Sequence, residues 1–131
     1  MDIKNISNEL KHAPLDKNAN IRLIRLAGDD TLSTYAAEVA AMSSLQPHYH
    51  KYGVEIYQIF SGSGIMKTGS INGIALEWTA MSHVEAGDFF SIEAHTVHQI
   101  INNTSNPLIL IFSCPSDHLS TDRFFIQKKE D

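Results

Sequence analysis

Residues 46–57 read QPHYHKYGVEIY and contain the pattern on which the fold assignment depends. One residue separates His48 from His50, so on a β-strand both side chains point to the same face. Two imidazoles on one strand face can bind a single metal ion. A turn around Gly53 would place Glu55 on the following strand, with its carboxylate facing the same interior. The stretch therefore predicts two neighbouring strands that share a metal-binding face.

The strand after this turn has a period-two pattern of its own. Tyr57 and Ile59 have the same parity as Glu55, so we expect them to line the interior beside it. Ile56 and Phe60 have the opposite parity and are expected to face outwards.

Short apolar or alternating runs recur on both sides of this segment, and clusters of Gly, Asn, Ser and Asp separate them, one of them at residues 69–73. The runs occupy residues 21–26, 33–42, 46–50, 54–60, 64–68, 74–81, 89–92, 97–101 and 108–114. Many short strands without a long helical period favour an all-β sandwich or barrel. Two stretches leave the choice open. Residues 36–41 are rich in alanine, which favours helix, and residues 4–11 form either a short helix or irregular chain. No linker or repeat interrupts residues 1–131, so we expect one domain.

A later histidine supplies a third imidazole. Residues 87–88 predict a turn, residues 89–92 a strand and residues 93–96 a second turn, after which His98 lies in the next strand. Three neutral imidazoles and one carboxylate suit Mn, Fe, Ni, Co, Cu or Zn, and an octahedral ion would keep about two positions for water or substrate. We therefore expect one divalent transition metal per chain. The expected ligands are His48, His50, Glu55 and His98.

These segments resemble the paired motifs of the cupin superfamily of double-stranded β-helix barrels. The matching residues of the first motif are His48, His50, Glu55 and Gly62, and those of the second are Gly87, His98 and Asn102. The motifs span residues 42–62 and 87–102. The resemblance implies a jelly-roll barrel, open at one end, with the metal inside.

The sequence departs from the cupin motifs at three positions. Met42 stands where the first motif begins with glycine, and Glu93 and His95 stand at the proline and glycine positions of the second. Non-glycine residues resist positive φ, so the form of the turn before His98 stays open.

Three further residues are candidates for a supporting role at the site. His95 is a candidate to donate a hydrogen bond to a ligand or an acidic substrate, or it is simply exposed. Gln46 shares the parity of His48 and is a candidate for the pocket mouth. Tyr57 is either a pocket wall or a core residue, and the same alternatives apply to Trp78.

The remaining histidines and the cysteine have plainer interpretations. We expect His12, His83 and His118 to be exposed to solvent, with His83 in a loop before Gly87. Cys114 ends an apolar strand and is expected to be a small buried hydrophobe, with a catalytic thiol as the alternative.

Composition excludes several other classes. The 131 residues carry a formal net charge of −5, so no broad basic surface for nucleic acid is expected. A single cysteine excludes an internal disulfide and a four-thiolate zinc site. The apolar run 108–112 is far short of the roughly 20 residues that span a bilayer, and no secretory signal is evident. We expect a cytoplasmic protein that binds neither nucleic acid nor membrane.

Three functions fit this pattern. The first is a metal-dependent enzyme acting on a small oxygen-rich metabolite, of the dioxygenase, decarboxylase or isomerase type. The second is a non-catalytic, metal-dependent barrel that binds or senses a small ligand. The third is a barrel whose metal only stabilises the fold, although structural sites are normally closed. The resemblance also implies a homodimer, in which strand 21–26 is the candidate for exchange because exposed edges need covering.

Overall fold

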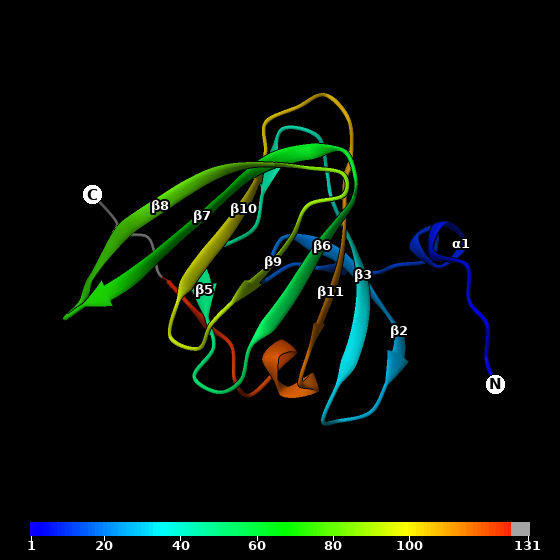
Figure 1. Ribbon diagram of the computed structural model, residues 1–131, viewed down its shortest axis with the longest axis horizontal. Helices are drawn as coiled ribbons and strands as arrows, with labels where there is room; N and C mark the ends of the chain where they lie inside the picture. The colour runs from blue at the N-terminus through cyan, green and yellow to red at the C-terminus, as the bar shows by residue number, and fades with distance from the viewer. Residues whose placement is uncertain (127–131) are drawn as a thin grey trace.

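Two antiparallel β-sheets face each other in the computed structural model, which describes residues 1–126 (Figure 1). One sheet has the order β1-β2-β3-β11-β6-β9: β1 (Leu15–Asp16), β2 (Ile21–Gly28), β3 (Ser33–Val39), β11 (Leu108–Cys114), β6 (Glu55–Ser61) and β9 (Phe89–Ile92). The other has the order β12-β5-β10-β7-β8, with β4 on β10: β12 (Phe124–Phe125), β5 (His48–Tyr49), β10 (Val97–Asn102), β7 (Ser63–Asn72), β8 (Ala75–Glu85) and β4 (Ser43–Ser44). The predicted all-β class is confirmed. The predicted single domain, residues 1–131, extends beyond the described residues.

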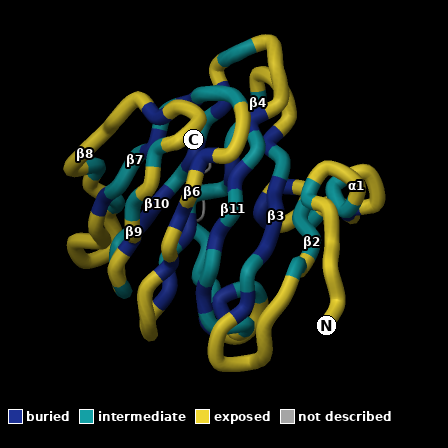
Figure 2. The backbone as a smooth tube through the Cα atoms, turned by 45° about the vertical axis from the view of Figure 1, so that its right-hand side comes forward, coloured by how far each residue is buried: buried dark blue, intermediate teal, exposed yellow. Residues whose placement is uncertain are grey.

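Strand β6 alternates between the interior and the surface, as its sequence predicts. Glu55, Tyr57 and Ile59 are at most 4% exposed, whereas Ile56 and Phe60 are 36% and 44% exposed. The bend at residues 51–53 has Gly53 at a φ of 77° and separates β5 from β6. Figure 2 shows the buried backbone concentrated in the inner strands of both sheets.

The alanine-rich stretch is a strand and not a helix. Ala36 and Ala37 are fully buried in β3, which lies between β2 and β11. Tertiary packing overrides helix propensity here, because β2 pairs with this strand as far as Glu38 and β11 as far as Val39. The other open choice resolves to the short helix α1 (Ile6–Leu10), whose first turn is capped by the side chain of Asn5.

The β7–β8 hairpin is longer than predicted, and the turn expected at residues 69–73 is shorter and lies at residues 73–74. The two strands pair from Ser63–Glu85 to Asn72–Ala75, so only Gly73 and Ile74 turn the chain. Gly69 lies inside β7 at a register shift, and a Cβ there would be 2.4 Å from the Glu77 carbonyl oxygen. That glycine serves a β-bulge rather than a turn. His83 is exposed, as expected, but it lies in β8 and not in a loop.

Stacked aromatic rings fill part of the space between the sheets. Tyr57 lies 5.4 Å from Phe90 and 5.7 Å from Phe112, and Phe112 stacks on Tyr35 at 5.1 Å. Each ring buries a large apolar area and prefers this offset stacking. The row joins β9, β6, β11 and β3 and gives Glu55 a rigid apolar surrounding.

After β11 the chain turns back towards the site, which the strand pattern did not predict. Residues 116–119 form the 3-10 helix η1 (Ser116–Leu119), and β12 then pairs with β5. Strand β2, the candidate for exchange between subunits, pairs with β1 and β3 of its own chain. Within residues 1–126, no helix has the length and apolar character to cross a membrane.

Candidate metal centre

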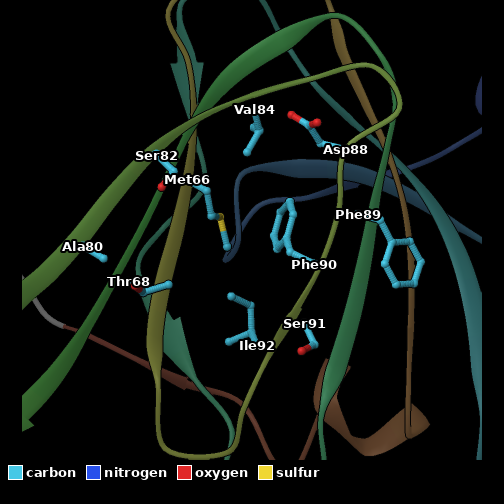
Figure 3. Close-up of a pocket in the computed structure, with 10 residues that line it drawn as sticks. All are labelled: Met66, Thr68, Ala80, Ser82, Val84, Asp88, Phe89, Phe90, Ser91 and Ile92. Carbon is cyan, nitrogen blue, oxygen red and sulfur yellow. The ribbon is translucent and has the colours of Figure 1, made fainter.

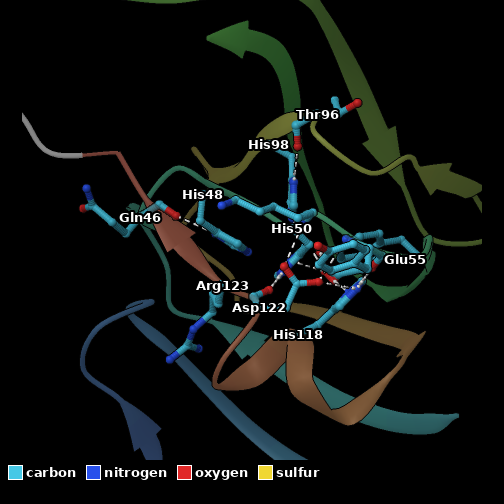
Figure 4. A network of polar contacts seen from close by, with 12 residues as sticks. Gln46, His48, His50, Glu55, Thr96, His98, His118, Asp122 and Arg123 are labelled. Atoms are coloured by element: carbon cyan, nitrogen blue, oxygen red, sulfur yellow. Dashed lines mark hydrogen bonds and ion pairs between the residues drawn. The ribbon is translucent and has the colours of Figure 1, made fainter. Parts of the chain in front are cut away.

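Four buried side chains from three strands and a loop meet between the sheets. His48 lies on β5 directly opposite His98 on β10, Glu55 begins β6, and His50 follows β5. Each is at most 5% exposed, and one nitrogen or oxygen atom from each lies within 4.8 Å of the others. Figure 4 shows these side chains gathered at one place. The structure thus brings together all four predicted ligands, and metal binding itself stays a prediction.

Backbone carbonyls set the orientation of all three imidazoles. Nδ1 of His48 lies 2.9 Å from the Gln46 carbonyl oxygen, and Nδ1 of His98 lies 3.0 Å from that of Thr96. Nδ1 of His50 lies 2.5 Å from the Asp122 carbonyl oxygen. Because a carbonyl only accepts, each Nδ1 carries the hydrogen, and each Nε2 of a neutral ring presents a lone pair.

The lone pairs fit a cation. Nε2 of His50 and Nε2 of His98 are buried without a hydrogen bond, yet they lie 3.0 and 3.6 Å from Oε1 of Glu55. Such acceptors repel one another in a buried site unless a cation lies among them. Ligand atoms about 2.1 Å from an ion are about 3.0 Å apart at right angles and about 3.4 Å apart in a tetrahedron. The residues present therefore fit a transition metal.

Burial and neighbouring charges favour the protonation states that a metal needs. Burial, together with the neighbouring His98, lowers the pKa of His48 from 6.5 to about 3, so its ring stays neutral. Burial alone would raise the pKa of Glu55, but its histidine neighbours, His118 first, hold it well below its ordinary value when they carry a proton towards the carboxylate. A neutral imidazole and an ionised carboxylate are the binding forms.

The supporting candidates take different places. The Tyr57 hydroxyl donates to Oε1 of Glu55 at 3.1 Å, and burial followed by the Glu55 charge raises its own pKa. Gln46 contacts the site through its carbonyl, while its side chain donates to the Ile126 carbonyl. The His95 side chain is exposed, and its backbone N–H donates to the His50 carbonyl at 2.7 Å.

Two positions where the cupin motifs have glycine hold other residues here, and both have a positive φ. Met42 has a φ of 55° and His95 a φ of 65°. Non-glycine residues adopt this conformation at an energetic cost, so both turns have the backbone conformation that glycine favours although neither position holds glycine.

The expectation that His118 is exposed is wrong. The side chain is fully buried, its Nδ1 lies 3.8 Å from Oε2 of Glu55, and its ring stacks on His50 at 4.1 Å. Asp122 is also buried, and its carboxylate accepts from the backbone N–H groups of Lys51 and Tyr52. No local spacing signals either contact, because the partners are far away along the chain.

The family model of the cupin domain matches residues 37–114, which is more than half of the 131 residues. The chain is a cupin. No curated protein gives a significant match, but solved structures share the fold of this cupin and confirm the predicted double-stranded β-helix.

Three structures illustrate the likeness. An uncharacterized conserved protein with a double-stranded β-helix domain from Klebsiella pneumoniae superposes with a TM-score of 0.70 at 16% identity, over 98% of this chain and 99% of that one. A cupin 2 conserved barrel domain protein from Salinispora arenicola gives 0.63 at 21% identity, over 86% and 87%. KdgF from a Halomonas species gives 0.61 at 17% identity, over 76% and 83%. At these identities, the likeness concerns the fold.

A small cavity of about 30 Å³ is lined by three of the four residues of the cupin site, His48, His50 and Glu55. Its other walls are mostly apolar: Ala19, Ile21, Leu23, Leu45, Tyr57, Leu110, Phe112 and Leu119. Arg123 also lines it, and the Arg123 guanidinium forms an ion pair with Asp16 at 2.6 Å. The cavity has room for about one or two water-sized groups, in a largely apolar surrounding.

Several larger grooves lie elsewhere on the cupin. One of about 350 Å³ lies beside β9, where Met66, Phe90 and Ile92 point towards one another and Phe89 points away (Figure 3). Another, of about 750 Å³, is lined by Gln46 and Trp78, among others. None of these grooves is lined by a residue of the four-residue site, so the candidate site for chemistry is the small cavity.

Proposed function

We propose that this cupin binds one divalent transition metal through His48, His50, Glu55 and His98. The observation that carries the proposal is the pair of buried, unpartnered Nε2 atoms facing a carboxylate oxygen. The set of three nitrogens and one oxygen suits Mn, Fe, Co, Ni, Cu or Zn. A bound metal would supply Lewis acidity towards a carboxylate, enol or keto oxygen or, in the case of iron, dioxygen chemistry.

We further propose that the site acts on a small oxygen-rich metabolite, as a dioxygenase, decarboxylase or isomerase. The protein's own contribution is orientation and exclusion of water. Tyr57 holds the Glu55 carboxylate, and the apolar walls strengthen electrostatic interactions inside the cavity. The small cavity volume favours a ligand of few atoms.

The same small volume supports the alternative that a metal here only stabilises the fold. A Co²⁺-loaded protein separates the two, because azide can bind only where a coordination position is open. A change in the visible Co²⁺ spectrum on adding azide supports an open, reactive site. An unchanged spectrum at saturating azide favours a structural metal. A non-catalytic ligand barrel would show the spectral change without turnover of any metabolite.

We also propose that the protein is a cytoplasmic homodimer that takes small molecules as partners. The free, buried Cys114 suits a reducing compartment. Strand β9 ends one sheet with Phe89 69% exposed, and β8 ends the other with Met81 67% exposed. Light scattering after gel filtration measures the subunit number, and a monomer at all concentrations would contradict the dimer.

A further inference from the structure

The segment of residues 115–126, here named the C-terminal clasp, lies beyond the residues that the cupin family model matches, 37–114. It comprises η1, β12 and the chain around them. It nevertheless contacts three of the four residues of the candidate metal centre, namely His48, His50 and Glu55.

Asp122 supports His50 in two ways. Its carbonyl accepts the hydrogen of His50 Nδ1 at 2.5 Å, which directs the lone pair of Nε2 towards Glu55. Its carboxylate accepts from the backbone N–H groups of Lys51 at 2.7 Å and Tyr52 at 3.0 Å. These bonds hold the chain that follows His50, so the position of the imidazole depends on Asp122.

His118 supports both His50 and Glu55. Its ring lies parallel to that of His50, with centroids 4.1 Å apart and 2° between the planes. Its Nε2 is bonded to the Tyr52 carbonyl, and its buried Nδ1, which makes no hydrogen bond, lies 3.8 Å from Oε2 of Glu55. Oε1, the other oxygen, faces the histidines of the site. The two oxygens of the Glu55 carboxylate thus have different neighbours: Oε2 faces His118, and Oε1 faces His50 and His98.

The clasp is attached at its far end as well. Strand β12 pairs with β5, where Phe125 lies opposite His48 and their rings are 5.5 Å apart. Arg123 forms an ion pair with Asp16 of β1. The clasp therefore packs directly on the metal-centre side chains.

We propose that His118 and Asp122 are positioning residues of the metal centre, and that metal binding and docking of the clasp stabilise each other. This inference rests on the proposed metal binding. The physical reason is linkage: if the docked clasp orients His50 and Glu55 for the ion, the bound ion must favour the docked clasp by the same free energy. Partners that orient metal ligands typically change metal affinity by about 10–100-fold.

Affinity for Co²⁺ tests the positioning role. His118→Phe keeps an aromatic ring against His50 but removes both nitrogens, and Asp122→Asn removes one acceptor for the 51–52 backbone. We expect the Co²⁺ affinity of each variant to be lower than that of the wild type by at least about 10-fold. Exposed Ser120, in the same segment, supplies the control Ser120→Ala, with unchanged affinity. A structural role alone would lower the melting temperature of metal-free and Co²⁺-loaded protein equally, with affinity retained, and that result would overturn the inference.

Hydrogen exchange tests the coupling. Saturating Co²⁺ should slow amide exchange across residues 115–126 in the wild-type chain and leave it unchanged in His98→Ala. If bound Co²⁺ leaves the rate of amide exchange in the clasp unchanged, the inference is overturned, although the proposed metal site stands. A wild-type chain that binds no Co²⁺ overturns both. Two Co²⁺ per chain with a thiolate-to-cobalt absorption band, lost in Cys114→Ser, would make His118 a ligand of a second ion and also overturn it.

Discussion

The two motif segments, residues 42–62 and 87–102, and the C-terminal clasp, residues 115–126, build the same site in different ways. The motif segments supply His48, His50, Glu55 and His98, whose spacing in the sequence already implies a shared face. The clasp supplies contacts to those side chains from residues far away along the chain, such as Asp122 to His50. The local spacing of the sequence therefore predicts the four ligand residues. The groups that orient these ligands come from a distant part of the chain and depend on its tertiary structure.

The largest expected effect is the loss of metal-dependent stability when a motif ligand is removed. Metal at 100 times its dissociation constant should stabilise the wild-type chain by about 2.7 kcal/mol. His98→Ala should show no such gain, because it lacks one of the four ligands. Thermal unfolding of each protein with and without metal gives the difference directly. An equal metal-induced gain in stability in both proteins would show that His98 is not a metal ligand.

A smaller effect is expected at Tyr57, which supports Glu55 without being a proposed ligand. Tyr57→Phe removes the hydroxyl that donates to Oε1 at 3.1 Å. A hydrogen bond to a charged group contributes about 1.5–3 kcal/mol, so metal-free protein should lose about 2 kcal/mol. Denaturant unfolding measures the loss. Trp78→Phe, a substitution outside the site, is the comparison, and equal losses in both variants would contradict a specific role for the hydroxyl.

The metal-free protein should lose stability as the pH falls from 6.5 to 4.5. The pKa of His48 is about 3 in the folded chain against 6.5 ordinarily, so only the unfolded chain takes up this proton in that range. The free energy of unfolding should fall by up to about 1.4 kcal/mol per pH unit. Burial lowers the pKa of His118, but the nearby Glu55 carboxylate outweighs burial and the pKa is raised. The contribution of His118 to the slope therefore has the opposite sign and is concentrated at and above pH 6.5.

Denaturant unfolding of wild type and His48→Asn across this pH range measures that contribution. The variant should show a flatter dependence, since it lacks the group that titrates only on unfolding. Parallel curves would show that His48 is not held neutral.

The smallest effect is expected at the turn before His98. His95 has a φ of 65°, and glycine adopts positive φ without the penalty of about 1 kcal/mol that other residues incur. His95→Gly should therefore raise stability by at most about 1 kcal/mol. His95→Ala keeps the Cβ and should give no gain. Equal melting temperatures for the glycine and alanine variants would show that the turn is not strained.

Sequence reasoning succeeded where the information is local. The alternation of Glu55, Tyr57 and Ile59 and the bend at Gly53 were readable because strand parity and turn chemistry act over a few residues. It left the alanine-rich residues 36–41 open between strand and helix, and pairing with β2 and β11 decides for a strand up to Val39.

The clasp was missed for a related reason. His118 follows a strand that looks terminal, and its burial results only from its approach to Glu55 and Tyr52. Strand β12 consists of two residues and is defined by its pairing with β5, not by a pattern of its own. Long-range contacts of this kind leave no periodic trace in the sequence.

Elemental analysis of protein purified without added metal tests the central claim most directly. We expect about one transition-metal ion per wild-type chain and a clear deficit in both His48→Ala and His98→Ala. Full metal content in either variant would contradict the four-residue metal centre.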